Sequence, residues 1–273
     1  MNFAVVDSGA SKAHWRWVAG DGNVQAFETE GIHPHHISSA QMSERIPAAL
    51  QNGGIEHLFF YGAGCSNLQS INTLHAALQS KFKDANIHIY PDYWGAARAL
   101  FAHRQGVVGI LGTGSSCCLY DGREVVANSC SLGYLLGDEG SATDLGKRLL
   151  RAYYYRQLPA HLAADLPLNL PDSLHSLYHS NAPANYLASF VPFLLAHKTD
   201  IFVQQLISEA FNDFMTYHIK PLWKPNLPLG IVGSVGCLLA DIFTQVAAIQ
   251  GITAIQFLQY PIQNLVKYHQ NLT

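Results

Sequence analysis

The sequence predicts an α/β fold made of two duplicated halves, and three observations support this prediction. Apolar stretches typical of strands alternate with helical patterns along the 273 residues. The order strand, glycine turn, strand occurs at the amino terminus and again in the middle of the chain. These two glycine turns lie roughly 105 residues apart, which is too far for a solenoid repeat but suits a duplicated domain.

The first half is expected to form a mixed sheet, because it opens with antiparallel hairpins. Asp21-Gly22-Asn23 has the composition of a hairpin turn. Pro34 keeps the residue before it out of the helical region, which predicts a loop over 31–36. The apolar patterns predict strands at 3–7, 14–18, 24–28, 58–62 and 87–90, and helices at 39–51, 72–82 and 93–103.

The second half repeats this order and then becomes more helical. Its strands are predicted at 107–111, at 117–120, after the turn Asp121-Gly122, at 229–232 and at 255–258, and its helices at 142–155, 201–218, 238–249 and 262–270. Prolines without a clear period predict a loop-rich connection over 159–185. We expect an N-terminal domain over 1–104 and a C-terminal domain over 105–261, with the closing helix, 262–273, returning to the N-terminal domain.

Composition excludes several classes of protein. Apolar residues make up 49% of the chain and charged residues 13%, about half the usual share of roughly 25%. Few charges on a largely apolar chain favour an oligomer, expected to be a homodimer, or a compact soluble enzyme. A net charge of −3 gives no basic stripe for nucleic acid. No run reaches the roughly 18 apolar residues of a membrane span, and the start does not resemble a signal peptide. Five cysteines, an odd number, indicate reduced thiols and a cytoplasmic protein.

Three glycine-containing turns follow predicted strands. Asp7-Ser8-Gly9-Ala10-Ser11-Lys12 and Gly112-Thr113-Gly114-Ser115-Ser116 each lie between two strands, and Gly233-Ser234-Val235-Gly236 precedes a helix. Small residues let a phosphate approach successive backbone N–H groups, and an aspartate can hold magnesium through water. Each turn is also compatible with ordinary turn chemistry. None has the Gly-Lys-Ser/Thr ending of a P-loop, which disfavours a Walker-type NTPase.

Two acidic positions have both a structural and a chemical interpretation. Asp92 directly precedes a predicted helix, so it can cap that helix or act as a general base toward a sugar hydroxyl. Asp138 and Glu139 stand between Gly137 and Gly140, where the dipole of a helix start favours acids. Binding of a ligand is the other explanation for two adjacent acids there.

A group of histidines, His33, His35 and His36, has the appearance of a metal site. The chain contains 14 histidines, and no carboxylate stands near this group in the sequence. A loop facing a sugar, or plain surface, therefore explains the group better than a metal.

The chain resembles the N-acetylglucosamine kinase group, through Asp7-Ser8-Gly9-Ala10-Ser11-Lys12, Gly112-Thr113-Gly114-Ser115 and Gly137-Asp138-Glu139-Gly140-Ser141 in this order, with Asp92 between the first two. That group belongs to the wider family of ATPases that activate benzoyl-CoA reductase and 2-hydroxyacyl-CoA dehydratase. The resemblance runs from Phe3 to about His269. It implies an α/β, duplicated actin-like ATPase (ribonuclease H-like) fold, with two domains, mixed sheets and a cleft between them.

The resemblance also implies a sugar kinase that uses ATP and Mg²⁺. Asp7 would lie near Mg²⁺, through water, and Asp92 would be the catalytic base. The residues expected to bind ATP are Gly9, Ala10, Ser11, Lys12, Thr113, Gly114, Gly233 and Ser234. Those expected to bind the sugar, most simply N-acetylglucosamine or a related N-acetylhexosamine, are His33, Asp92, Ser115, Ser116, Gly133 and Asp138.

Several positions depart from the family's pattern. The phosphate turn usually reads Asp-Gly-Gly-Thr, and here Ser11 supplies the hydroxyl. The sugar loop usually offers Asn where this chain has His33, and a usual Gly-Trp-Gly has become Ser131-Leu132-Gly133. A Pro-x-x-Gly-Leu pattern near the end has become Pro261-Ile262-Gln263-Asn264-Leu265. The nucleotide half therefore matches better than the sugar half.

Two other functions stay open at this point. One is an activator ATPase for a CoA-ester reductase or dehydratase, which would hold an iron–sulfur cluster through thiolates. The other is a catalytically silent sugar or nucleotide sensor, which would need no base at Asp92.

Overall fold

The computed structural model describes residues 1–35, 37–166 and 170–271, and it divides into two compact units. Unit 1 comprises Met1–Arg104, Tyr120–Val125 and Tyr260–Thr273, and unit 2 comprises Gln105–Leu119 and Val126–Gln259. The segment Tyr120–Val125 groups with unit 1, although it falls inside the range 105–261 expected for the second domain. The Tyr120 hydroxyl donates a 2.9 Å hydrogen bond to the carbonyl of Ala102, which ties this hairpin turn to unit 1.

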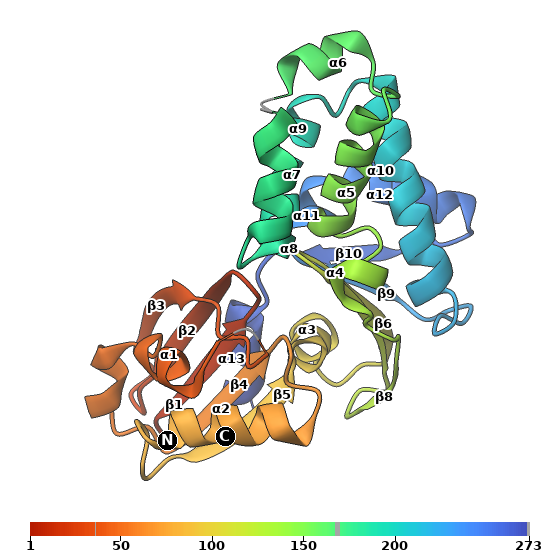
Figure 1. The fold of residues 1–273 in the computed structure, drawn as a ribbon. Coiled ribbons are helices and arrows are strands. Elements are labelled where there is room, and N and C mark those ends of the chain that lie inside the picture. Colours follow the sequence, from red (N-terminus) through yellow and green to blue (C-terminus); the bar gives the residue numbers. More distant parts are fainter. Residues whose placement is uncertain (36, 167–169, 272–273) are drawn as a thin grey trace. The chain divides into compact units, whose positions relative to one another are not determined.

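A five-stranded mixed sheet forms the centre of unit 1 (Figure 1). Its order is β3-β2-β1-β4-β5, and its strands are β1 (Phe3–Ser8), β2 (Lys12–Val18), β3 (Val24–Glu30), β4 (His57–Gly62) and β5 (Asn86–Pro91). Strand β1 is antiparallel to β2 and parallel to β4, and β4 is parallel to β5. The carboxyl ends of β1, β4 and β5 therefore meet at one edge, where open α/β sheets bind ligands.

Helices pack on both faces of this sheet, because successive side chains of a strand point to opposite faces. Ala4 and Val6 of β1 are buried in a cluster with residues of α1 (Ser39–Glu44) and α2 (Leu68–Gln79). On the other face, the ring of Phe3 lies 6.2 Å from that of His269. His269 belongs to α13 (Ile262–Gln270), which packs with α3 (Asp92–Phe101). By the same alternation, Asp7 shares the face of Phe3 and of α3.

The single helix predicted over 39–51 is wrong. A capping box formed by Ser38 and Gln41 begins α1, which ends at Glu44, and a separate 3-10 helix (Ala48–Asn52) follows. Pro47 lies between them, and its ring and missing N–H prevent a helix from continuing through that position.

Unit 2 contains a second five-stranded sheet with matching connectivity. Its strands are β6 (Gly106–Leu111), β7 (Ser115–Tyr120), β8 (Val125–Asn128), β9 (Leu229–Val232) and β10 (Ile255–Leu258). The order β8-β7-β6-β9-β10 repeats β3-β2-β1-β4-β5 position by position. Strands β6, β9 and β10 are parallel, as β1, β4 and β5 are. The predicted duplication is confirmed.

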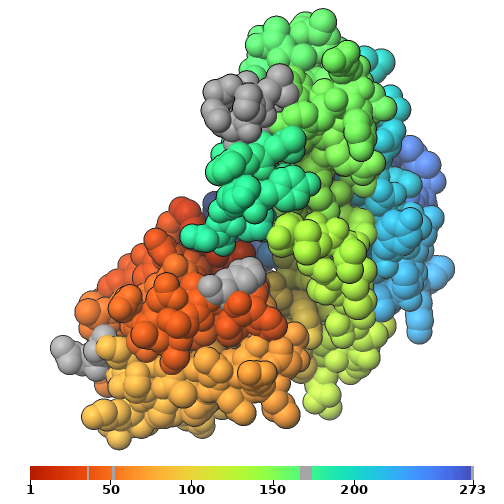
Figure 2. Space-filling model, in the orientation of Figure 1, coloured from red at the N-terminus to blue at the C-terminus, as the bar shows by residue number. Residues whose placement is uncertain are grey.

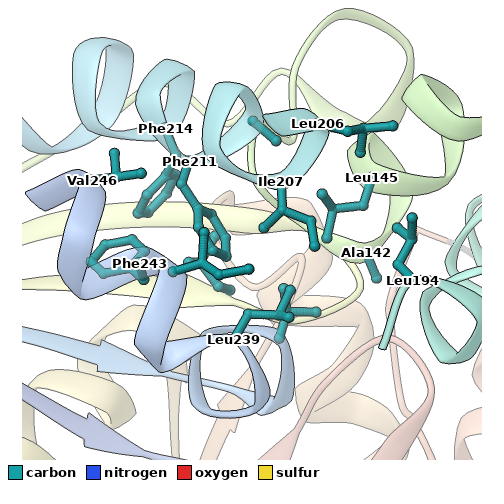
Figure 3. Close-up of a cluster of buried hydrophobic side chains, with 14 of the residues drawn as sticks. Ala142, Leu145, Leu194, Leu206, Ile207, Phe211, Phe214, Leu239, Phe243 and Val246 are labelled. Carbon is teal, nitrogen blue, oxygen red and sulfur yellow. The ribbon is translucent and has the colours of Figure 1, made fainter. Parts of the chain in front are cut away.

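The core of unit 2 lies between this sheet and a helical layer (Figure 3). The ring of Phe243 lies 5.2 Å from that of Phe211 and 6.4 Å from that of Phe214. Leu145 joins the same cluster. The helices of this layer are α4 (Gly133–Leu136), α5 (Ala142–Tyr154), α9 (Val191–Ala196), α10 (Ile201–Phe214), α11 (Ser234–Leu238) and α12 (Ala240–Ile249). A π-helical turn, Met215–Ile219, directly continues α10.

The loop-rich connection predicted over 159–185 is also wrong, because most of its described residues are helical. They form α6 (Ala160–Asp165), α7 (Leu170–His179) and α8 (Pro183–Ala188), while 167–169 lie outside the described residues. Pro159 directly precedes α6, and Pro183 is the first residue of α8. Proline is compatible with a first helical turn, so these prolines begin helices rather than exclude them. Helix α7, green in Figure 2, lies at the surface on the face shown.

We predict that Gly146→Ala destabilises the protein, although alanine is the better helix former by about 1 kcal/mol. A Cβ at position 146 in α5 would lie 2.0 Å from the backbone carbonyl oxygen of Leu187 in α8. Backbone cannot shift cheaply, so overpacking should cost about 1–3 kcal/mol. Thermal unfolding should report a lower Tm.

The matched control is Ser176→Ala, at an exposed position of α7 in the same unit. It should leave the Tm unchanged or raise it slightly, since it changes only helix propensity. An equal or higher Tm for Gly146→Ala would contradict the close packing of α5 on α8.

Candidate functional site

The first glycine turn follows β1 and rests on a neighbouring loop of unit 1. The Gly9 N–H donates to the Lys12 carbonyl at 2.9 Å and closes the turn. A Cβ on Gly31 would lie 2.3 Å from the Gly9 carbonyl oxygen, so only glycine lets the loop approach this closely. The buried Ser8 hydroxyl accepts the N–H of Ile32 at 2.9 Å. The turn therefore has a fixed position at the carboxyl end of β1.

Asp92 lies at the same edge of the sheet. It directly follows β5 and is the first residue of α3, with Pro91 in the N-cap position. Its Oδ1 accepts the N–H of Tyr93 at 2.9 Å. The carboxylate thus contributes to the first turn of α3 without being the N-cap residue. Its second oxygen is not used by that contact.

Burial makes both carboxylates of this edge hard to ionise. Burial, and to a lesser degree the negative charge of Asp92, together raise the pKa of Asp7 to about 7. Burial also raises the pKa of Asp92 to about 6, against hydrogen bonds from the Tyr93 and Asp92 backbone N–H groups. A cation near Asp7 would offset this cost. A carboxylate with a pKa of about 6 is matched to accepting a proton near neutral pH.

His33 lies in the loop that follows β3, next to the carboxyl end of β4. A Cβ on Gly64 would lie 2.6 Å from the His33 ring, which gives the glycine there a packing reason. The neighbouring His35 contacts the Gly64 carbonyl at 3.2 Å and the Ser70 hydroxyl at 2.8 Å. His36 lies outside the described residues.

Lys12 makes a different contact from the one expected. Its Nζ lies 2.6 Å from Oε1 of Glu28 on the neighbouring strand, and both side chains are exposed. Its carbonyl closes the first glycine turn, as described above. Its ammonium group is paired with Glu28, and a role in binding ATP stays a prediction.

In unit 2, the second glycine turn follows β6 and is tied to the start of α5. The Gly112 and Thr113 carbonyls accept the N–H groups of Ala142 and Thr143, at 2.9 and 3.1 Å. The hydroxyls of Ser115 and Ser116 are buried, and neither has a hydrogen-bond partner among the described residues. Buried polar groups are usually paired, so these two hydroxyls are suited to a ligand.

The carboxylate of Asp138 lies next to this second glycine turn. Its Oδ1 accepts the Ser115 N–H at 3.2 Å, and a Cβ on Gly114 would lie 3.0 Å from the same oxygen. Its φ of 61° is uncommon for a residue other than glycine. Burial raises the pKa of Asp138, against the Ser115 hydrogen bond and the charge of Lys147. Gly133 begins the short helix α4 in the same segment.

The third glycine turn packs against the second within unit 2. Gly233 has a φ of 115°, and a Cβ there would lie 2.4 Å from the Leu111 carbonyl oxygen. Ser234 follows as the first residue of α11. The structure therefore brings together Thr113, Gly114, Ser115, Asp138 and Gly233 in unit 2, and Asp7, Gly9, His33 and Asp92 in unit 1.

Comparison with known proteins gives the chain a family. No protein-family model and no curated protein matches it. Among solved structures, a putative N-acetylglucosamine kinase from Porphyromonas gingivalis is 33% identical, with a TM-score of 0.91 over 98% of this chain and 99% of that chain. The chain belongs to the N-acetylglucosamine kinase-like family.

More distant structures share the fold of this family member. A putative N-acetylglucosamine kinase from Chromobacterium violaceum is 19% identical, with a TM-score of 0.77 over 98% of both chains. A ROK family glucokinase from Streptomyces griseus, in complex with glucose and AMPPNP, is 13% identical, with a TM-score of 0.59 over 100% of this chain and 99% of that chain. The expected α/β, duplicated actin-like ATPase fold is confirmed.

Sequence reasoning missed the residues that hold these loops in place. His218 contacts Glu139, 79 positions away, at 2.9 Å, and Lys147 donates to the Tyr134 carbonyl at 2.7 Å. In unit 1, Ser8 and Gly31 likewise hold the first glycine turn against the neighbouring loop. Gly31, placed just before the histidine loop, was the one available signal, since glycine often marks close approach.

We predict that Asp7→Asn stabilises the protein at about pH 8, without metal or nucleotide. The folded pKa of Asp7, about 7, lies above the ordinary aspartate value of 3.8, so folding favours the protonated form. The resulting stability is present below the unfolded pKa and is lost as pH rises through about 7. Asparagine cannot ionise, so the gain should be at least about 1 kcal/mol.

Denaturant unfolding at about pH 8 and about pH 4 checks this sign, and the gain should vanish at the lower pH. Asp84→Asn, at an exposed position of unit 1, is the control and should change neither value. A loss of stability in Asp7→Asn at the higher pH would contradict the raised pKa.

Proposed function

We propose that this chain is an ATP-dependent kinase that phosphorylates a hydroxyl of an N-acetylhexosamine, with N-acetylglucosamine as the first candidate. The observation that carries the proposal is the carboxylate of Asp92 at the carboxyl edge of the unit 1 sheet, with a pKa raised to about 6. The 33% identity to a putative N-acetylglucosamine kinase supports the choice of sugar.

The three glycine turns would supply the nucleotide contacts. The backbone N–H groups of Gly9, Ala10, Ser11 and Lys12 would bind phosphate oxygens, because small residues in a tight turn leave them accessible. Thr113 and Gly114 would bind the terminal phosphates. Gly233 and Ser234 would lie against the adenosine. The ROK family glucokinase complex with AMPPNP supports a nucleotide for this fold.

Magnesium fits the same proposal, because Asp7 offers a carboxylate whose ionisation a cation would favour. When bound, Mg²⁺ would neutralise charge on the phosphates. Asp7 would hold it through water, and Asp92 is the nearby charge that gives the site its second negative group.

Asp92 would act as the general base. Its ionised carboxylate would accept the proton of the attacking sugar hydroxyl and become a carboxylic acid. The sugar oxygen would form a bond to the γ-phosphorus as the bond from that phosphorus to the β-phosphate oxygen breaks, which releases ADP. Positioning and charge stabilisation supply most of the catalysis in such transfers.

Several loop residues are proposed as sugar contacts. His33 stands where the family offers Asn, and an imidazole can likewise donate or accept a hydrogen bond. Asp138 and the segment beginning at Gly133 would bind sugar hydroxyls in unit 2. The unpartnered hydroxyls of Ser115 and Ser116 would complete this set.

The activator function is less compatible with the cysteines. Iron–sulfur clusters need thiolates, but burial raises the pKa of Cys65 to about 12 and that of Cys117 well above its ordinary value. Of the five cysteines, all of which lie in the described residues, only Cys130 is exposed. A silent sensor would not need a base at Asp92. A kinase therefore accounts for Asp92 and the cysteines better than an activator ATPase or a silent sensor does.

The proposal extends to the location of the protein in the cell, its oligomeric state and the class of its substrate. Within the described ranges, no helix combines the length and apolar character needed to cross a membrane. The five cysteines all lie in the described residues and form no disulfide, which favours the cytoplasm. The low share of charged residues favours a homodimer. A net charge of −3 favours a small-molecule substrate over nucleic acid.

The direct test is an assay with purified protein, ATP, Mg²⁺ and a panel of sugars. N-acetylglucosamine, N-acetylmannosamine, N-acetylmuramic acid and glucose would be supplied separately, and the sugar phosphate and ADP would be quantified by mass spectrometry. One sugar phosphate should form for each ADP, with an N-acetylhexosamine as the best substrate. ADP formation without any sugar phosphate would reject the kinase and favour an ATPase.

We predict that Asp92→Asn lowers kcat by roughly 10²–10⁴-fold, the usual cost of losing a general base. Asparagine keeps the shape and the oxygen that accepts the Tyr93 N–H, so the fold should be kept and the KM for ATP should change little. Above about pH 6 the Tm should rise, because Asn carries no charge that folding must bury. Steady-state kinetics and thermal unfolding measure these quantities. A near-normal kcat would leave Asp92 with only its structural role at the start of α3.

We also predict that Asp138→Ala raises the KM for the sugar by roughly tenfold or more and leaves that for ATP unchanged. The loss of a charged hydrogen-bond acceptor costs about 1.5–3 kcal/mol. Asp84→Ala, at an exposed position of unit 1, serves as the control and should change neither KM. The assignment fails if the KM for ATP rises while that for the sugar stays constant.

A further inference from the structure

His218 is a buried histidine whose two ring nitrogens both contact side chains of distant segments. It is 4% exposed and belongs to the π-helical turn Met215–Ile219 at the end of α10. Its Nδ1 lies 2.8 Å from the Ser129 hydroxyl, and its Nε2 lies 2.9 Å from Oε2 of Glu139. Both contacts give partners to ring nitrogens that are buried with the side chain.

The Glu139 contact connects His218 to the loop that carries Asp138. Glu139 directly follows Asp138, whose φ of 61° requires support from its surroundings. On the preceding side, Lys147 donates to the Gly137 carbonyl at 3.1 Å. Asp138 therefore lies between two held neighbours, one bound by Lys147 and the other by His218.

The same end of α10 also packs on the residue after Glu139. Gly140 has a φ of 74°, and a Cβ there would lie 3.0 Å from the Cβ of Phe214. The loop thus packs on α10 at Gly140 and is hydrogen-bonded at Glu139 to the π-helical turn that follows α10. π-helical turns are uncommon and occur frequently at functional sites.

The bond between His218 and Glu139 requires a donor on the histidine. Burial raises the pKa of Glu139, but the hydrogen bond from His218 and the charges of His218 and Lys147 outweigh it and hold that pKa below its usual range. The carboxylate is therefore ionised near neutral pH and only accepts hydrogen bonds. The Nε2–H of His218 donates to it, whether the ring is neutral or protonated.

We propose that His218 is a positioning residue for the sugar: by holding Glu139 it fixes the loop Gly137–Gly140 and so orients the Asp138 carboxylate. The inference rests on the proposed function for the role of Asp138 as a sugar contact. The part that concerns the loop itself rests only on the contacts of His218, Glu139 and Lys147.

Two substitutions separate the two contacts of the ring. The amide nitrogen of Gln occupies nearly the place of Nε2, so His218→Gln keeps a donor for Glu139 and loses Ser129. The amide of Asn reaches only as far as Nδ1, so His218→Asn keeps a partner for Ser129 and loses Glu139. Both variants lose the ring from the core, and Asn fills less of the space than Gln by one methylene group.

The first readout is hydrogen–deuterium exchange of the backbone amides of 133–141. We expect clearly faster exchange in His218→Asn and near wild-type exchange in His218→Gln. The second readout is the KM for the sugar, which should rise about tenfold in His218→Asn, the change for one lost hydrogen bond to a charged group. The KM for ATP should stay constant in both variants.

A second variant covers the case in which His218→Asn does not fold. Glu139→Ala breaks the same contact from the loop side, at a side chain that is 21% exposed, and should reproduce both changes. His161→Asn, which removes another histidine–carboxylate contact of unit 2, with Asp200 at 2.8 Å, is the control and should alter neither readout.

The outcomes distinguish this inference from the proposed function. Equal exchange in the Gln and Asn variants, or unchanged exchange in Asn and in Glu139→Ala, would overturn the positioning role. If the wild-type protein phosphorylates no sugar, the proposed function fails, and the exchange comparison still decides whether His218 holds the loop. Faster exchange with an unchanged sugar KM would also overturn the proposal, since the loop would then not orient a sugar contact.

Discussion

The cost of burying two carboxylates is the constraint on which the candidate site depends. Asp7 is the second-last residue of β1 and Asp92 directly follows β5. Burial is the largest cause that raises their pKa values to about 7 and about 6. A protein that only needed stability would place neutral residues there, because buried charge is expensive. The same cost gives Asp92 the properties of a base near neutral pH and gives Asp7 a reason to attract a cation. The two carboxylates thus lower the stability of the protein, and the same raised pKa values suit them to a reaction at this edge of the sheet.

The remaining parts of each site are positioned by glycines, because a residue without a Cβ lets a neighbouring segment approach closely. Gly31 and Gly64 bring loops of unit 1 against the first turn and His33, while Gly114 and Gly233 do so for Asp138 and Leu111 in unit 2. At each position a Cβ would lie 3.0 Å or less from its neighbour. The duplicated sheets thus carry equivalent turns. Side chains such as His218 and Lys147 then hold the irregular loops beyond the ends of the strands.

The sequence was sufficient for the elements with strong periodicity and for the turns with small residues. The strands, the duplication and the three glycine turns could be predicted, because each depends on local pattern. Pro47 and Pro183 were misjudged in opposite directions, since a proline ends one helix and begins another depending on its position within the turn. The contact of His218 with Glu139 spans 79 positions and depends on tertiary packing, so no local pattern could reveal it. The raised pKa values of Asp7 and Asp92 depend on burial in the same way.

The most direct test of this account is a titration of the aspartate carboxyl groups by ¹³C NMR, in wild-type protein and in Asp92→Asn, without metal or nucleotide. The account predicts two carboxyl groups that titrate near 6 and near 7 in the wild type. In Asp92→Asn, one of these should disappear and the other should move down, because the neighbouring negative charge is gone. If every aspartate titrates near the ordinary value of about 4, the buried pair is not the basis of the site.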